Sequence, residues 1–282
     1  MKASTRISCT AATLVAMATP AFAQSEDKMW QGGYIGGSVG IGAQTNDRNE
    51  TVVFDTNLDG TFGDTVRTTT GANAFSPGFC GGAANGRTPA EGCRSDKDGI
   101  EFFARAGYDE QVGNFVYGVV LDGGTSRSRD SVTAFSTTPA FYTFTRELDY
   151  SVSARARVGY AARGALFYGT AGTNYGRIKQ QMVTSNGANS FNGNMMIDRD
   201  TTSAWGWSAG GGAEVKIARN LALGLEYLYT SYNDDDYNVL VGPGTAALTN
   251  PFRIVNPSGT NMRRGDRDFA AHNIRVTAAF RF

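Results

Sequence analysis

The sequence predicts an eight-stranded antiparallel transmembrane β-barrel with long extracellular loops. Two observations support this fold class. Eight stretches of the chain alternate between apolar and polar residues, as a strand does when its two faces meet different surroundings. The connections between these stretches also alternate between short and long, which is typical of barrels that cross an outer membrane.

The clearest alternation runs from Glu147 to Tyr160, which is 14 residues and therefore longer than an average globular strand of about 5–6 residues. A tilted membrane strand of about 9–11 residues with an extension beyond the bilayer fits this length better. We expect Leu148, Tyr150 and the apolar residues up to Tyr160 to face outward, and Glu147, Asp149, Arg155 and Arg157 to face inward.

Seven further strands are expected near residues 33–44, 99–109, 115–122, 165–177, 203–217, 221–230 and 271–282. The stretch 165–177 is mixed, and we assign Phe167, Ala171 and Tyr175 to its outer face. Tight links are predicted at 110–114, 161–164 and 218–220, and long polar loops at 45–98, 123–146, 178–202 and 233–270. Aromatic residues at several strand ends match the interfacial girdles of membrane barrels.

The inner face of the predicted barrel contains charges of both signs. An eight-stranded barrel is narrow and its side chains largely fill it, so we expect these charges to form a self-neutralising ion-pair network. A narrow conduction path lined by the same groups is the alternative. The chain has 36 glycines, and Gly36, Gly40, Gly206, Gly210 and Gly212 fall on this face, where long charged side chains need room. The predicted lumen residues are Glu101, Arg105, Asp109, Asp149, Arg155, Arg157, Glu214, Lys216, Glu226, Arg275 and Arg281.

The N-terminus has the pattern of a secretory signal peptide. Lys2 and Arg6 precede a short apolar run, and Ala21-Phe22-Ala23 places small residues at the cleavage positions. We therefore expect a signal peptide over residues 1–23 and an outer-membrane barrel domain over residues 24–282.

Export to an oxidising compartment has a consequence for the cysteines. Cys80 and Cys93 are the cysteines that remain after residue 23, and twelve residues separate them in the first long loop. We predict that they form a disulfide that stiffens an exposed loop. Their spacing is not the C-x-x-C of redox catalysts.

A weak calcium motif lies in the same loop. Asp55, Asn57 and Asp59, followed by Gly60, match the start of a calcium-binding loop. Position 12 is Val66, so the closing glutamate is missing, and Asp64 comes too early to replace it simply. A polar surface turn is the preferred interpretation, and no other cofactor is expected.

Several function classes are excluded. The chain has 26 basic and 26 acidic residues, so it lacks the basic face that nucleic-acid binding needs. His272 is the only histidine, which excludes a multi-histidine metal site and leaves little for acid–base catalysis. Gly206-Trp-Ser-Ala-Gly210 imitates a hydrolase motif but sits inside a predicted strand. We expect no enzyme activity.

Six segments spread over the predicted strands follow a recognisable pattern: Trp30-Gln-Gly-Gly-Tyr-Ile-Gly-Gly, Ala106-Gly-Tyr with Gln111-Val-Gly-Asn-Phe, Arg155-Ala-Arg-Val-Gly-Tyr, Tyr168-Gly-Thr-Ala-Gly, Leu225-Glu-Tyr-Leu-Tyr and Arg275-Val-Thr-Ala-Ala-Phe-Arg-Phe. In these segments the chain resembles the small outer-membrane β-barrel proteins of alphaproteobacteria, the Omp25-like family that is related to the OmpA membrane domain. The resemblance implies an integral outer-membrane protein with a structural or porin-like role.

The last strand looks like the signal that the barrel-assembly machinery reads, with Phe280 and Phe282 as its key residues. Outer-membrane lipid and lipopolysaccharide are the other expected partners. The preferred function is a structural, envelope-stabilising role with surface-exposed loops, and a small porin-like channel is the alternative. A soluble lipocalin-like barrel is disfavoured because its interior should be apolar.

Overall fold

The computed structural model describes residues 28–44, 50–96, 98–192, 200–234 and 237–282. The signal peptide expected over residues 1–23 lies outside these ranges. Within them, no helix is long and apolar enough to cross a membrane.

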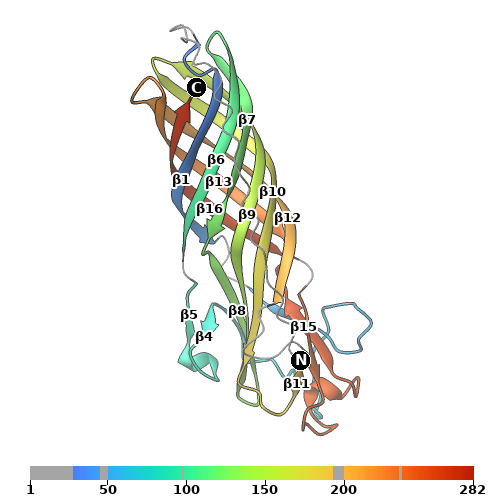
Figure 1. The fold of residues 1–282 in the computed structure, drawn as a ribbon. Coiled ribbons are helices and arrows are strands. Elements are labelled where there is room, and N and C mark those ends of the chain that lie inside the picture. Colours follow the sequence, from blue (N-terminus) through green and yellow to red (C-terminus); the bar gives the residue numbers. More distant parts are fainter. Residues whose placement is uncertain (1–27, 45–49, 97, 193–199, 235–236) are drawn as a thin grey trace, which may run out of the picture.

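Eight antiparallel strands close into a barrel, as the sequence predicts. Each strand pairs with its neighbours along the chain, and the last strand pairs with the first from Tyr34↔Arg281 to Gln44↔Ala271. Figure 1 shows these two strands side by side, in blue and dark red. The barrel strands are β1 (Gly32–Gln44), β6 (Gly99–Val112), β7 (Phe115–Ser126), β9 (Ala140–Ala162), β10 (Ala165–Thr184), β12 (Asp200–Lys216), β13 (Leu221–Asn233) and β16 (Asp268–Arg281).

The barrel distributes polarity in the opposite way to a soluble protein. Large apolar side chains on its outside are exposed, for example Phe115 at 64% and Trp205 at 66%, whereas arginines in its interior are buried, with Arg157 at 2% and Arg281 at 1%. Such an exposed apolar surface fits lipid rather than water. The short turns at Gly113–Asn114, Arg163–Gly164 and 217–220 all lie at one end of the barrel.

The long connections, predicted as polar loops, contain strands at the other end of the barrel. We call this region the outer lobe; Figure 1 shows it opposite the C-terminus. Here β9 and β10 continue past the barrel, and β8 (Arg129–Ser136) pairs with β9. The remaining strands are β2 (Val52–Asp55), β3 (Gly78–Gly81), β4 (Ala83–Ala84), β5 (Cys93–Arg94), β11 (Ser190–Phe191), β14 (Val239–Gly242) and β15 (Thr260–Arg264), with 3-10 helices η2 (Pro89–Glu91) and η3 (Pro251–Arg253).

The outer lobe has a hydrophobic core of its own. A four-stranded sheet in the order β11-β14-β15-β2 contributes buried side chains such as Val241 and Met262. The extended strands contribute Tyr142 and Phe144 from β9 and Met182 from β10. The prediction of long polar loops was wrong here because burial of this apolar surface stabilises a folded structure.

A β-bulge at Asp149 corrects the predicted faces of β9. Tyr150 pairs with Arg177 on β10, but Leu148 pairs with the next residue, Ile178, so Asp149 is the extra residue. Leu148 is therefore buried inside, at 6% exposure, instead of facing outward. The alternation from Glu147 to Tyr160 that the sequence suggests is thus interrupted at Asp149.

The disulfide between Cys80 and Cys93 is present, with the two Cα atoms 6.5 Å apart. It ties β3 to β5, and β3 in turn pairs with β8 in the outer lobe. The bond thereby fixes the hairpin of β4 and β5 against the extended barrel strands.

Candidate functional site

The candidate functional site is the barrel interior. Glycines on the inner face mainly allow neighbouring strands to approach closely. A Cβ atom on Gly40 would lie 2.4 Å from the carbonyl oxygen of Ile274 and 2.7 Å from Cγ of Arg275, so this glycine avoids both the next strand and a charged side chain. A Cβ atom on Gly210 would lie 2.0 Å from the carbonyl oxygen of Tyr227.

Eight charged residues form two closed squares across the lumen. In the first, Arg105 contacts Asp122 at 2.8 Å and Glu226 at 2.6 Å. Arg155 contacts the same two carboxylates, with 3.3 Å to Glu226. These residues come from β6, β7, β9 and β13, so the square joins opposite walls of the barrel.

The second square lies nearer the short turns. Arg157 contacts Asp109 at 2.7 Å and Glu214 at 2.8 Å. Arg281 contacts the same pair at 2.7 Å and 3.3 Å. A separate pair joins Arg275 and Glu101 at 2.9 Å. These groups, five arginines and five carboxylates, balance one another in charge.

Aromatic rings fill the space around the squares. The guanidinium of Arg157 lies 4.6 Å from the ring centroid of Tyr168, and that of Arg281 lies 4.8 Å from the ring of Trp30. The Tyr168 hydroxyl donates a hydrogen bond to Glu226 at 2.9 Å. Such cation–π contacts and hydrogen bonds offset part of the cost of burying these charges.

Two of the residues assigned to the inner face, Glu147 and Asp149, differ from expectation. Asp149 pairs with Lys179 on the partly exposed outer side, because the bulge turns it outward. Glu147 pairs there with Arg129 for the same reason. Lys216 keeps its predicted inner face at the short-turn end, where its Nζ lies 5.8 Å from the ring centroid of Trp30, but it belongs to neither square.

The predicted set of lumen charges omitted Asp122, which two arginines of the first square contact. The alternation of its strand does place Asp122 opposite the apolar face, so the signal was present in the sequence. It also did not anticipate an ionic cluster at the base of the outer lobe, where Asp130 contacts Arg146 at 2.7 Å and Arg264 at 2.9 Å. The alternation of polar and apolar residues could not identify Arg264, because this residue lies on a short strand in a segment that the sequence predicts to be a polar loop.

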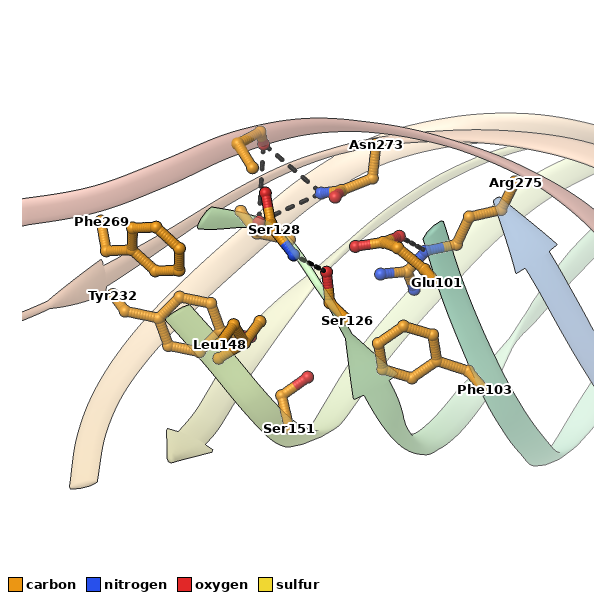
Figure 2. A pocket seen from close by; sticks show the side chains of 12 residues that line it. Glu101, Phe103, Ser126, Ser128, Leu148, Ser151, Tyr232, Phe269, Asn273 and Arg275 are labelled. Atoms are coloured by element: carbon orange, nitrogen blue, oxygen red, sulfur yellow. Dashed lines mark hydrogen bonds and ion pairs between the residues drawn. The ribbon is translucent and has the colours of Figure 1, made fainter. Parts of the chain in front are cut away.

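Apolar clusters lie at both ends of the lumen. Trp30, Val116, Leu166 and Ala222 pack together at the short-turn end. Leu148, Ile178, Ala204, Tyr232 and Phe269 pack together toward the outer lobe. Figure 2 shows a small cavity between this second layer and the Glu101–Arg275 pair, lined by hydroxyl groups that include Ser126 and Ser151. Its volume of about 10 Å³ is close to that of one water molecule.

The base of the outer lobe contains a carboxyl group with a shifted pKa. Burial raises the pKa of Glu50 to about 8, against the attraction of Arg264, and nearby Asp130 adds to the increase. Burial also acts to raise the pKa of Asp130, but Arg264 and Arg146 outweigh it and hold that pKa below its ordinary value. Oxygen atoms of Glu50, Asp96 and Asp130 lie within 4.8 Å of one another, and the two arginines supply the compensating charge.

The weak calcium motif forms a hydrogen-bonded turn. The carboxylate of Asp55 accepts bonds from the backbone N–H groups of Asp59 and Gly60, and Asp64 accepts from Thr56. The Asn57 side chain donates to Asp59. These contacts account for the four residues as parts of a polar turn.

The remaining residues singled out from the sequence lie on the barrel wall. The imidazole of His272 is exposed on the outer face, with Nδ1 2.6 Å from the Tyr227 hydroxyl. Ser208 of the Gly206–Gly210 segment points inward and donates to Asn174. Phe280 and Phe282 are exposed on the outside at 51% and 49%.

A closed antiparallel barrel with an apolar exterior and a charged, paired interior defines an integral outer-membrane β-barrel protein. The chain belongs to the outer membrane protein beta-barrel domain family, which matches residues 9–282. This membership confirms the fold class and the outer-membrane location that the sequence predicts.

Individual relatives are similar over part of their length. The chain is 32% identical over 133 residues to a 22 kDa outer membrane protein of Rhizobium leguminosarum, covering 47% of this chain and 53% of the relative. It is 35% identical over 130 residues to a 31 kDa outer-membrane immunogenic protein of Brucella melitensis, covering 45% and 51%. The chain thus spans about half the length of the curated relatives it matches. These relatives confirm the resemblance to small alphaproteobacterial barrels.

Among solved structures, the outer membrane protein OprG from Pseudomonas aeruginosa is similar in fold. The sequences are 11% identical, and the match covers 89% of this chain and 97% of OprG with a TM-score of 0.47.

The squares predict a strong dependence of stability on Asp122. Replacing Asp122 with Asn leaves Arg105 and Arg155 with one carboxylate between them, and we expect a loss of about 3–5 kcal/mol in unfolding free energy. The matched variant Asp149→Asn removes a partly exposed pair and should cost less than about 1 kcal/mol. Urea unfolding in lipid vesicles measures both, and equal losses would contradict the assignment of Asp122 to the buried network.

The raised pKa of Glu50 predicts a pH dependence of the outer lobe. Because this pKa is about 8 in the folded protein and near 4.5 ordinarily, the stability that protonated Glu50 contributes is complete below the lower value. It is lost as the pH rises through 8. We expect the urea concentration at which the lobe becomes protease-sensitive to fall between pH 5 and 8.5, and to fall less in Glu50→Gln.

Glu91→Gln is the matched control for this experiment. Glu91 is exposed, and hydrogen bonds from Thr88 lower its pKa, so it stays ionised over the whole range. The control should keep the wild-type pH dependence. An unchanged pH dependence in Glu50→Gln would refute the role given to Glu50.

Proposed function

We propose that this protein is a closed, non-conducting barrel that stabilises the outer membrane and presents a rigid outer lobe at the cell surface. The observation that supports this most is the filling of the lumen along its length. Two neutral squares of arginines and carboxylates occupy the middle, and an apolar layer lies at each end.

An ion that crossed this interior would meet two energetic barriers. A permeating ion would have to separate arginine–carboxylate contacts of 2.6–2.8 Å, which are fully buried. It would also have to cross the layer that contains Leu148, Tyr232 and Phe269, which offers few groups to replace its hydration shell. These features favour a structural role over the alternative of a small channel.

The same features support a non-catalytic role. His272 faces the outside of the barrel next to Tyr227, and the carboxylates of the lumen are each held by arginines. Neither arrangement presents a base or nucleophile to a substrate-sized space.

We also infer the partners of the barrel from its surface. Lipopolysaccharide, whose phosphates are anionic, is the expected neighbour of Arg127 and Arg177. Both are exposed, Arg127 directly after β7 and Arg177 on β10, and neither forms a hydrogen bond or ion pair through its side chain with the described part of the chain. The outer lobe stands beyond these residues, where surface molecules can reach it.

Planar-bilayer recording tests the closed lumen. We expect purified protein to give no reproducible conductance steps, because the squares and apolar layers leave no continuous aqueous path. A general porin recorded in the same bilayers is the positive control, and heat-modifiable gel migration verifies that the inserted protein is folded. Reproducible steps of uniform size would favour the channel.

We further propose that the barrel-assembly machinery recognises the last strand through Phe280 and Phe282. Both rings project outward, and the backbone N–H of Phe282 donates to the carbonyl oxygen of Gly33 at 3.0 Å, beside the barrel seam. Deletion of Phe282 should lower the amount of protein in the outer membrane several-fold, as measured by fractionation and immunoblotting. Replacement of Phe115, another exposed outer-face phenylalanine, with Leu is the control, and unchanged levels after the deletion would exclude this role.

A further inference from the structure

The outer lobe contains a cavity of about 230 Å³ that lies where all four long connections meet. The first connection contributes Phe75, the second the turn between β8 and β9, the third Asn186 and the fourth Phe252. Its volume is below the usual range of ligand-binding pockets, about 300–1,000 Å³, which suits a single ring rather than an extended molecule. The lining consists of Ala74, Phe75, Ser136, Thr137, Thr138, Pro139, Ala140, Tyr142, Ser185, Asn186, Gly187, Ala188, Asn250, Pro251 and Phe252.

Hydrogen bonds between the connections hold the cavity open. The backbone N–H of Thr137 donates to the carbonyl oxygen of Ala74 at 2.8 Å. The Asn186 side chain donates to the Tyr142 hydroxyl at 3.0 Å. The Asn250 side chain donates to Asn189 at 3.2 Å. Because these bonds join separate segments, the shape does not depend on a ligand, which reduces the entropic cost of binding.

The floor of the cavity is aromatic. The ring centroids of Phe75, Tyr142 and Phe252 lie 5.4–5.7 Å from one another, so the three rings form one rigid cluster. Each of the three residues is only 2–4% exposed, so the cluster serves mainly as a rigid base. Pro139, which is exposed, and Pro251, which is half-buried, present the apolar surface against which the C–H groups of a ligand pack.

The walls are polar, yet no lining residue is an acid or a base. The hydroxyl groups of Thr137 and Thr138 are exposed and form no hydrogen bond with the described residues. Burial raises the pKa of the Tyr142 hydroxyl, so this group also stays neutral. A charged ligand would lose hydration here without meeting an opposite charge.

We propose that this cavity binds a neutral sugar, one pyranose ring of a saccharide. One face of such a ring presents C–H groups that match the proline surface beside the aromatic cluster, and its rim presents hydroxyls that match those of Thr137 and Thr138. A purely apolar ligand would leave these two threonine hydroxyls without partners once water is displaced. This inference does not depend on whether the barrel conducts.

Saturation-transfer NMR on the purified protein tests the proposal. The protein is kept in a zwitterionic detergent without a sugar headgroup, because maltoside or glucoside detergents would compete. The probes are the methyl pyranosides of glucose, galactose and mannose, together with N-acetylglucosamine. We expect at least one probe to bind with roughly millimolar affinity, as its few non-hydrogen atoms imply. No saturation transfer to any of the four at tens of millimolar would overturn the proposal.

A blocking variant locates the binding. A Cβ atom on Gly187 would meet nothing within 4 Å and its backbone has no positive φ, so Gly187→Trp can place an indole at the cavity without strain. We expect it to weaken binding at least tenfold. Ala90→Trp, on the exposed helix η2 outside the lining, is the matched control and should bind as the wild type does. Equal binding by Gly187→Trp and wild type would place the sugar elsewhere and overturn the proposal.

Two further measurements test the ligand class. Thr137→Val with Thr138→Val removes two hydroxyls but leaves the apolar floor, and should weaken sugar binding severalfold, whereas Thr65→Val outside the lining should not. The second measurement uses p-cresol as an apolar ring of similar size. If p-cresol binds in a way that Gly187→Trp abolishes while no sugar does, the cavity is an apolar site and the assignment to sugars is wrong.

Discussion

The structure depends on one constraint, namely that arginines inside a narrow barrel must each meet carboxylates. Isolated buried charges cost several kcal/mol, and a buried pair is tolerated only with good geometry and further hydrogen bonds. The two squares meet this requirement, because each arginine contacts two acids and each acid contacts two arginines. Since their members come from six different strands, a shift of one strand by one residue would break several contacts together.

At the bulge at Asp149, the kind of side chain that points to the inside of the structure changes. On the barrel side of the bulge, inward positions of β9 are polar or charged, as at Ser151, Arg155 and Arg157. On the lobe side, Arg146 still points inward to the ionic cluster, but Leu148, Phe144 and Tyr142 pack in apolar clusters. The same two strands, β9 and β10, thus pass from a structure with a polar inside and an apolar outside to one with an apolar core. Because of the bulge, the same pair of hydrogen-bonded strands fits lipid around the barrel and water around the outer lobe.

Much of the barrel could be predicted from the sequence because lipid imposes a strict period of two. The eight strands, the short turns and most inward charges follow from that alternation. Asp149 and Glu147 were misplaced because a bulge changes the face without leaving a mark in an otherwise perfect pattern. The outer lobe was missed for a different reason. Its strands are as short as the two residues of β11, and their apolar residues become a core only when four connections meet.

The outer lobe also explains why long connections need not be mobile. The disulfide between Cys80 and Cys93 constrains the first connection, and β15 pairs with β2, which joins the first connection to the fourth. Arg264 then links β15 to Asp130 and Glu50 at the base of the lobe. The β15–β2 pairing and the contacts of Arg264 join segments more than 100 residues apart, which lie together because the barrel places the strand ends side by side. The pairing of the barrel strands therefore has two effects. It brings the charged side chains of the lumen together, and it fixes the strand ends from which the outer lobe is built.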